Sequence, residues 1–105
     1  MQRIKVVVKR PDEPYGHCTN ISNSLKNLQN TVGGYIEVVQ LTPKIIAICN
    51  EDGKNLGLEK NFKIPGDVLV GTVIICGSDG EEFADLPIDF STWKKMLDTM
   101  QGMAF

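Results

Sequence analysis

A run of apolar residues in the middle of the chain constrains the fold more than any other feature. Residues 45–49, which follow Lys44, are apolar at every position. Successive side chains of a strand point to opposite faces, so a strand made only of apolar residues must be covered on both sides. The chain is therefore expected to place a central strand between two other layers.

Two further runs predict strands around this one. Residues 35–41 mix apolar and polar positions with a period of two, and Thr42-Pro43 then supplies a short hairpin connection. Residues 67–76 form a third apolar run that contains Gly71-Thr72. A glycine inside such a run indicates a bulge or a close approach to the backbone.

The amino-terminal segment predicts another strand. Residues 4–9 alternate in character, and the side that carries Lys5 and Lys9 is expected to face solvent. Residues 10–17 contain two prolines, a glycine and the one histidine of the chain, and they predict a loop.

Two helices are predicted from apolar stripes. The first begins after Asn20 or Ser22, ends at Gly33-Gly34 and has a stripe of Ile21, Leu25, Leu28 and Val32. The second begins after Asp89 or Ser91, ends at Gly102 and has a stripe of Trp93, Met96, Leu97 and Met100.

These elements predict an α+β fold. The order is strand, helix, three or more strands and helix, which favours a mostly antiparallel sheet of about four to five strands with two packed helices. The 105 residues are expected to form a single domain, residues 1–105, which is large enough to bury a core without disulfides or metal.

Composition and charge disfavour several classes of function. The formal net charge of −2 disfavours binding to duplex nucleic acid. The cysteines, Cys18, Cys49 and Cys76, are odd in number and widely spaced, which indicates reduced thiols in a cytoplasmic protein. No segment is long and apolar enough for a signal peptide or a membrane span, so no membrane partner is expected.

The sequence contains no evident catalytic or cofactor motif. With one histidine and no paired cysteines, neither a metal site nor a cofactor is expected, and the phosphate-loop and dinucleotide fingerprints are absent. His17 and Cys18 are neighbours that could act as the base and nucleophile of a catalytic dyad, although a polar loop is the simpler interpretation. Gly33-Gly34 is more typical of a helix cap than of a phosphate cradle.

One polar loop, residues 50–61, is the candidate binding site. It is rich in asparagine, glycine and charge, which suits directed hydrogen bonds but also suits a tight connection between strands, and both interpretations stay open. Tyr35 or Phe62 can stack on an aromatic ring of a ligand. The candidate ligand-binding residues are Gly33, Gly34, Tyr35, Asn50, Glu51, Lys54, Asn55, Asn61, Phe62, Gly71 and Thr72.

A set of spaced motifs runs through nearly the whole chain. It comprises Leu25, Leu28-Gln29, residues 32–39, residues 50–54, Leu56-Gly57-Leu58, Asn61, residues 67–72 and residues 83–86. Together these motifs resemble the family named Domain of Unknown Function 3846. The sequence departs from that family where Phe62 follows Asn61, because the family pattern usually has an arginine there, and no anion-binding role is carried over to this position.

The resemblance implies a small protein encoded by a bacteriophage or mobile element and located in the cytoplasm of its host. By analogy with other small phage proteins, it implies a non-catalytic anti-defence protein that sequesters a nucleotide-derived immune signal, in a pocket that a homo-oligomer can share. One alternative is a protein-interaction module that inhibits a host enzyme through a strand edge or the Trp93/Met96/Met100 face. Another is an enzyme that degrades the signal with His17, Cys18 or a loop carboxylate.

Overall fold

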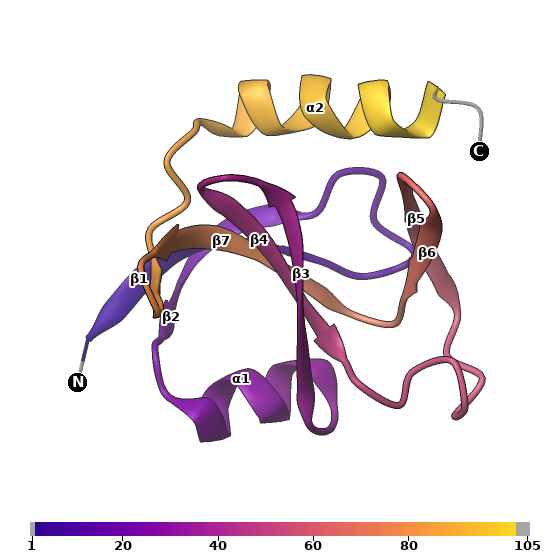
Figure 1. Cartoon of the computed structure of the whole chain (residues 1–105), viewed down its shortest axis with the longest axis horizontal. Coiled ribbons are helices and arrows are strands. Elements are labelled where there is room, and N and C mark those ends of the chain that lie inside the picture. Colours follow the sequence, from indigo (N-terminus) through magenta and orange to yellow (C-terminus); the bar gives the residue numbers. More distant parts are fainter. Residues whose placement is uncertain (1, 103–105) are drawn as a thin grey trace.

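Two helices enclose an antiparallel sheet in the computed structural model, which describes residues 2–102 (Figure 1). Residue 1 and residues 103–105 of the predicted domain lie outside this range. The sheet has the order β2 (His17–Ser22), β1 (Arg3–Lys9), β7 (Val73–Asp79), β4 (Ile45–Asn50) and β3 (Ile36–Thr42), and β8 (Glu82–Ala84) also pairs with β7.

The layers match the predicted α+β class. α1 (Leu25–Val32) covers one face of the sheet, and α2 (Phe90–Gly102) covers the other face (Figure 1). A separate hairpin of β5 (Lys60–Ile64) and β6 (Asp67–Val70) packs beside α2. The described chain therefore has more strands than the four to five predicted, but the expected class and the antiparallel pairing are confirmed.

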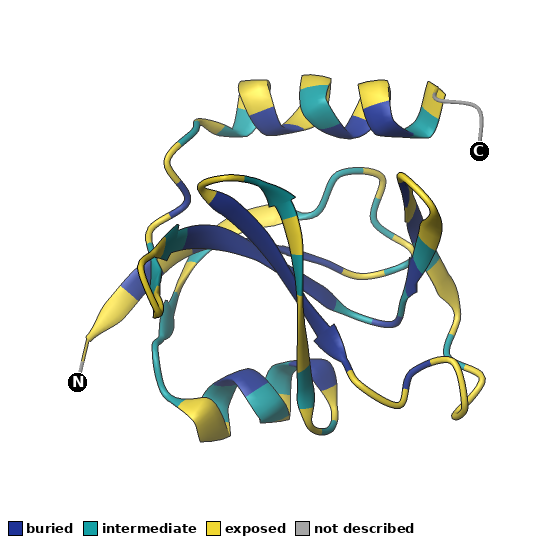
Figure 2. Cartoon of the chain, in the orientation of Figure 1, coloured by how far each residue is buried: buried dark blue, intermediate teal, exposed yellow. Residues whose placement is uncertain are grey.

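The strand that was predicted to be covered on both faces is β4. All of its residues are buried (Figure 2). Ala47 belongs to the cluster under α2, whereas Ile46 and Ile48 belong to the cluster under α1. The alternation of side chains thus divides one strand between two cores, as its composition requires.

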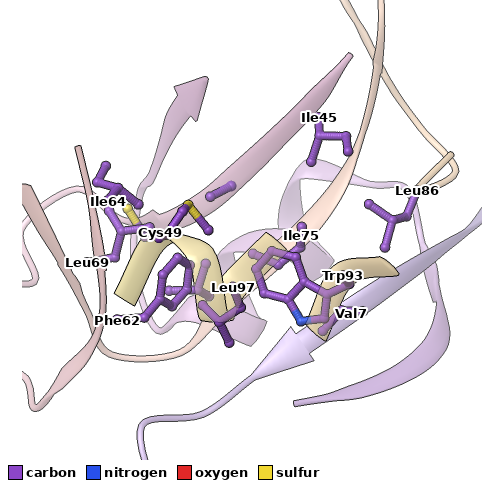
Figure 3. Close-up of a cluster of buried hydrophobic side chains, with 13 residues drawn as sticks. Val7, Ile45, Cys49, Phe62, Ile64, Leu69, Ile75, Leu86, Trp93 and Leu97 are labelled. Carbon is purple, nitrogen blue, oxygen red and sulfur yellow. The ribbon is translucent and has the colours of Figure 1, made fainter. Parts of the chain in front are cut away.

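The core under α2 is built around Trp93, which has no exposed surface (Figure 3). Its indole N–H donates to the carbonyl oxygen of Tyr15 at 2.9 Å, and its ring meets that of Phe62 edge to face with centroids 5.9 Å apart. Met100 is also buried and Met96 packs against the same cluster. Trp93 and Met100 are therefore core residues, and Met96 is half-buried, so this helix face exposes little surface.

The first helix, α1, begins later in the chain than predicted, because an additional strand precedes it. Residues 17–22 form the edge strand β2, which the sequence analysis assigned partly to a loop and partly to the first helix. The helix is capped by Ser24, whose hydroxyl accepts from the N–H of Asn27 at 3.2 Å, rather than by Asn20 or Ser22. Ile21 still packs on the core under α1, but from β2.

Two other strand predictions need correction. On the basic side of β1, Lys5 is exposed as predicted, but Lys9 is only 3% exposed. Residues 67–76 do not form one bulged strand, because Gly71 adopts φ of 71° between β6 and β7. The hairpin at Thr42-Pro43 is confirmed by the pairing of Thr42 with Ile45.

No helix in the described range is long and apolar enough to cross a membrane.

Candidate functional site

The end of α1 forms one wall of the candidate site. The N–H groups of Gly33 and Gly34 both donate to the carbonyl oxygen of Gln29, at 2.8 and 3.0 Å. Gly33 has φ of 84°, the left-handed conformation that this type of helix end requires. The predicted helix cap is confirmed, and both glycine N–H groups are used in the cap rather than being free to bind phosphate.

Asn50, the last residue of β4, ties this helix end to the following loop. Its side chain is 7% exposed; its Nδ2 donates to the carbonyl oxygen of Val32 at 3.3 Å, and its Oδ1 accepts from the N–H of Asp52 at 2.8 Å. A Cβ at position 34 would lie 2.8 Å from Nδ2 of Asn50, so Gly34 is needed for this close packing. Asn50 therefore shapes the site by holding its walls together.

The loop between β4 and β5 is held by its own backbone. The N–H of Gly53 donates to Asn50 at 3.1 Å, that of Leu56 to Asp52 at 2.9 Å, and that of Leu58 to Gly53 at 3.0 Å. A Cβ at Gly53 would lie 2.7 Å from the side chain of Val70, so the loop also packs closely on β6. The turns and the close packing account for a glycine at position 53. The backbone hydrogen bonds also order the loop that carries the polar side chains of the site.

Between α1 and this loop lies a cavity of about 560 Å³, called here the Tyr35 cavity. Tyr35 is 68% exposed and Leu56 is 62% exposed, and both side chains line this one cavity although neither belongs to a core cluster. The complete lining is Gln29, Asn30, Gly33, Gly34, Tyr35, Asn50, Asp52 and Leu56. The site thus combines two unpacked apolar surfaces with amide and carboxylate groups.

The charge of the Tyr35 cavity is one-sided. The carboxyl end of α1 carries the negative end of the helix dipole, and the lining includes the carboxylate of Asp52 but no lysine or arginine. The cavity therefore attracts hydrogen-bond donors and positive charge, and it disfavours an anionic group deep inside.

A second cavity of about 330 Å³ meets the first at Asn50 and is called here the Lys54 cavity. Its remaining lining is Glu37, Cys49, Glu51, Lys54, Asn55, Asp67, Val68, Leu69 and Val70. The ammonium of Lys54 contacts the carboxylate of Asp67, and this hydrogen bond lowers the pKa of Asp67 below its usual value. Because Lys54 is already paired, an anion entering here has to compete with Asp67.

The thiols and the histidine are poorly placed for nucleophilic chemistry. Burial raises the pKa of the Cys49 thiol to about 11 and that of the Cys76 thiol to about 12, so neither is a thiolate at neutral pH. Cys18 pairs with Val7 and His17 with Val8 across β1 and β2, so their side chains leave opposite faces of the sheet. Among the described residues, no group of three or more histidine, cysteine or acidic side chains is arranged to hold a metal ion.

Four predicted site residues lie away from both cavities. Phe62 is 4% exposed and packs against Trp93, so the prediction that it stacks on a ligand is wrong. Asn61 donates to the carbonyl oxygens of Lys9 and Gly71, at 2.8 and 2.7 Å, and is a structural link. Gly71 and Thr72 form the connection between β6 and β7.

Sequence reasoning missed a third cavity of about 600 Å³, called here the apolar cavity. It lies between the end of β3, the β5–β6 turn and α2, and it is lined by Gln40, Leu41, Thr42, Ile64, Pro65, Met96, Thr99 and Met100. Neighbouring residues in the sequence gave no signal for it, because its walls come from three distant segments. It carries no ionisable side chain, so it offers less chemical discrimination than the Tyr35 cavity.

Comparison with known proteins agrees with the resemblance in the motifs. A family model described as "Domain of unknown function (DUF3846)" matches residues 4–98. No curated protein and no solved structure matches the chain. The match runs from β1 into α2 and so includes every residue that lines the Tyr35 cavity.

Proposed function

The chain belongs to the family described as a domain of unknown function (DUF3846), and we propose that it is a non-catalytic binding protein. Its ligand is a small polar molecule with a flat ring, held in the Tyr35 cavity. The family description assigns no activity, so the proposal rests on the geometry of the cavity.

The observation that carries the proposal is the pair of exposed apolar side chains in one cavity. Tyr35 and Leu56 leave most of their surface in water, yet they line the same cavity as four polar side chains. Ligand sites in proteins combine apolar and aromatic walls with a few polar groups that fix orientation. A ring that contacts Tyr35 and Leu56 would remove their apolar surface from water.

The polar groups favour a particular orientation of the ligand. Gln29, Asn30 and Asp52 provide amide and carboxylate oxygens that accept from the N–H and O–H groups of a base or sugar. Because the dipole of α1 disfavours anions here, any phosphate on the ligand would point out of the cavity. A nucleoside-like part is therefore bound inside, and charged groups remain at the rim.

This orientation is compatible with a nucleotide-derived immune signal as the ligand. The proposed role is that of a phage-type protein which binds such a signal in the host cytoplasm and keeps it from its receptor. The analogy with small phage proteins supplies this role, and the cavity supplies a place for the ligand.

Binding without turnover is supported by the groups around the cavity. Its lining contains no histidine, lysine or cysteine, so the carboxylate of Asp52 has no such partner there. The thiol of Cys49, in the neighbouring Lys54 cavity, has a raised pKa because it is buried. Release of an intact ligand after heat denaturation would distinguish storage from hydrolysis.

The first test changes Tyr35. Tyr35→Ala is expected to weaken binding about tenfold or more, because stacking of a base on an aromatic side chain contributes about 1–3 kcal/mol. Calorimetry with cyclic dinucleotides and ADP-ribose isomers measures the effect. Leu25→Ala is the matched control, because Leu25 is 59% exposed and lies outside the cavity.

A second experiment identifies the ligand without choosing it in advance. The purified protein is incubated with extracts of cells whose nucleotide-signalling defence is active, freed of small molecules and denatured, and the released molecules are analysed by mass spectrometry. An intact nucleotide that the Tyr35→Ala variant fails to retain supports the proposal. No ligand from the extracts, together with no binding to the panel, overturns it.

One alternative function has a structural basis of its own. A module that inhibits a host enzyme needs an accessible surface, and on the Trp93/Met96/Met100 face Trp93 and Met100 are buried and Met96 is half-buried. The outer edge of β3 is open, because β3 is the last strand in the sheet order. Stoichiometric capture of one host enzyme, lost when Val38 on this edge is changed, would favour this alternative.

A further inference from the structure

β3 presents unpaired backbone groups along its outer edge. The N–H of Glu51 donates to the carbonyl oxygen of Tyr35 at 2.8 Å, and the same register continues through Glu37 and Val39. In an antiparallel ladder, residues alternate between those that bond to the neighbouring strand and those that point away. The backbone N–H and C=O groups of Ile36, Val38 and Gln40 therefore point away from β4.

The opposite edge of the sheet is partly blocked. On β2, the guanidinium of Arg3 donates to the carbonyl oxygen of Asn20 at 2.9 Å, and the side-chain amide of Asn27 donates to that of Ser22 at 3.0 Å. Across residues 2–102, no side chain donates to the carbonyl oxygens of Ile36, Val38 or Gln40. The two edges of the sheet thus differ in their capacity to accept another strand.

Along residues 36–40, the outer edge of β3 also lacks the residue types that prevent edge pairing. Natural edge strands carry lysine, proline or inward-pointing charge to avoid association. Residues 36–42 contain no lysine and no proline, and Val38 exposes 46% of its surface. Such an edge is suited to pairing with another strand.

We propose that the strand which pairs with β3 is β3 of a second copy of this chain. The two strands run antiparallel about a two-fold axis at Val38, so that the two six-stranded sheets join into one continuous sheet. Ile36 then pairs with Gln40 of the second copy, and Val38 pairs with its own counterpart. These are the residues whose backbone groups point outward, so the register satisfies donors and acceptors on both strands.

The side chains are self-complementary in this register. Glu37 is the one ionisable residue of β3, and it lies opposite Val39 of the second copy rather than opposite another carboxylate. No like charges face one another directly, which satisfies a basic requirement for pairing across strands.

A bulge limits the length of the paired segment, and the symmetry of the interface limits the number of copies to two. The register of β3 with β4 shifts between Gln40 and Thr42, so the regular segment is residues 36–40, with Val38 at its centre. Bulges end strand pairing by turning the edge away. Because the interface uses the same surface on both copies, it closes on itself and leaves no open β3 edge for further growth.

The test begins with the mass of the protein in solution. Sedimentation equilibrium of the wild-type chain is expected to give twice the monomer mass of 11.6 kDa. Val38→Pro removes an N–H that points away from β4, and proline is tolerated at such an edge position. The variant is expected to raise the dimer dissociation constant about tenfold or more, because two symmetric hydrogen bonds are lost.

Charge provides a matched pair of variants. Val38→Lys places two ammonium groups face to face on the two-fold axis and is expected to give a monomer with an unchanged circular dichroism spectrum. Asn20→Lys introduces the same charge on the exposed edge strand β2 and is expected to leave the dimer intact.

Crosslinking tests the register. In a Cys18→Ser background, Val38→Cys is expected to form a covalent dimer under mild oxidation, because paired residues lie within the Cα separation that a disulfide spans. Gln40→Cys is expected not to crosslink, since its counterpart lies opposite Ile36. A monomeric wild type throughout the accessible concentration range overturns the proposal, as does a dimer that persists in both Val38→Pro and Val38→Lys. The dimer does not depend on the Tyr35 cavity, so either proposal can fail alone.

Discussion

At the scale of single residues, the chain uses its polar side chains more for internal ties than the sequence indicates. Asn61 was predicted to contact a ligand, but its amide accepts from the ammonium of Lys9 at 2.6 Å and donates to two backbone carbonyls. Lys9 was predicted to face solvent and is 3% exposed. The alternation of residues 4–9 could not reveal this, because the β5–β6 hairpin that covers Lys9 is remote in sequence.

The buried Lys9 predicts a dependence of stability on pH. Burial lowers the pKa of its ammonium below the ordinary 10.5, so the unfolded chain binds more protons than the folded chain between the two pKa values. The free-energy cost of burying the charged ammonium is fully present below the folded pKa. It is relieved as pH rises toward 10.5.

Lys9→Met removes this titration. The free energy of unfolding of the wild type minus that of Lys9→Met is therefore expected to increase with pH from neutral toward 10.5. Urea unfolding of both proteins measures this difference, and the other lysines cancel in it. A difference that stays constant with pH would contradict the role given to Lys9.

At the scale of elements, glycines fix where helices and strands end. The Gly33-Gly34 cap could be predicted because a glycine pair after an apolar helical stripe has one common structural use. Gly71 was predicted to lie within one strand, whereas φ of 71° makes it a junction between β6 and β7.

Gly71→Ala is expected to destabilise the fold by about 1–3 kcal/mol through the left-handed backbone alone. A further cost is expected because the added Cβ would lie 2.7 Å from Cδ1 of Leu58. Gly57→Ala is the control, since Gly57 has φ of 70° with nothing within 4 Å of its Cβ position. The thermal unfolding midpoint of Gly71→Ala is expected to be lower than that of Gly57→Ala. Equal midpoints would show that the side chain of Leu58 moves aside at little cost in free energy.

The elements missed from the sequence share a physical cause. β2 is short, polar and at an edge, so it lacks the apolar alternation that marks a strand. The walls of the Tyr35 cavity were half predicted, because Gly33, Gly34, Tyr35 and Asn50 stand out locally. Asp52 and Leu56 lie within the predicted loop, residues 50–61, although they were not named singly. Gln29 and Asn30 were missed, since only the folding of the loop against α1 brings them to the cavity.

At the scale of the whole molecule, two cores share one sheet. β4 and β7 each contribute buried side chains to the cluster under α1 and to the cluster under α2. A loss of packing on one face therefore weakens the strands on which the other face depends, and the described part of the chain is expected to unfold as one unit.

Leu28→Ala tests this coupling. Leu28 is 1% exposed and belongs to the core under α1, so the substitution is expected to cost about 2–5 kcal/mol. Trp93, on the other face, is the single tryptophan. Its fluorescence and the far-ultraviolet circular dichroism should shift to the same lower urea midpoint, and a fluorescence midpoint that does not move would show independent faces.

The place of β1 in the sheet also has a consequence for synthesis. β1 pairs with β7, so that Val7 lies opposite Ile75, and a ribosome has to release most of the chain before these strands can meet. Pairing between strands so distant in sequence slows folding, because a long loop must close first. During translation, β1, β2 and α1 are synthesised before β7, the strand that lies between β1 and β4. The apolar residues of β4 therefore leave the ribosome before β7 is available to pair with them.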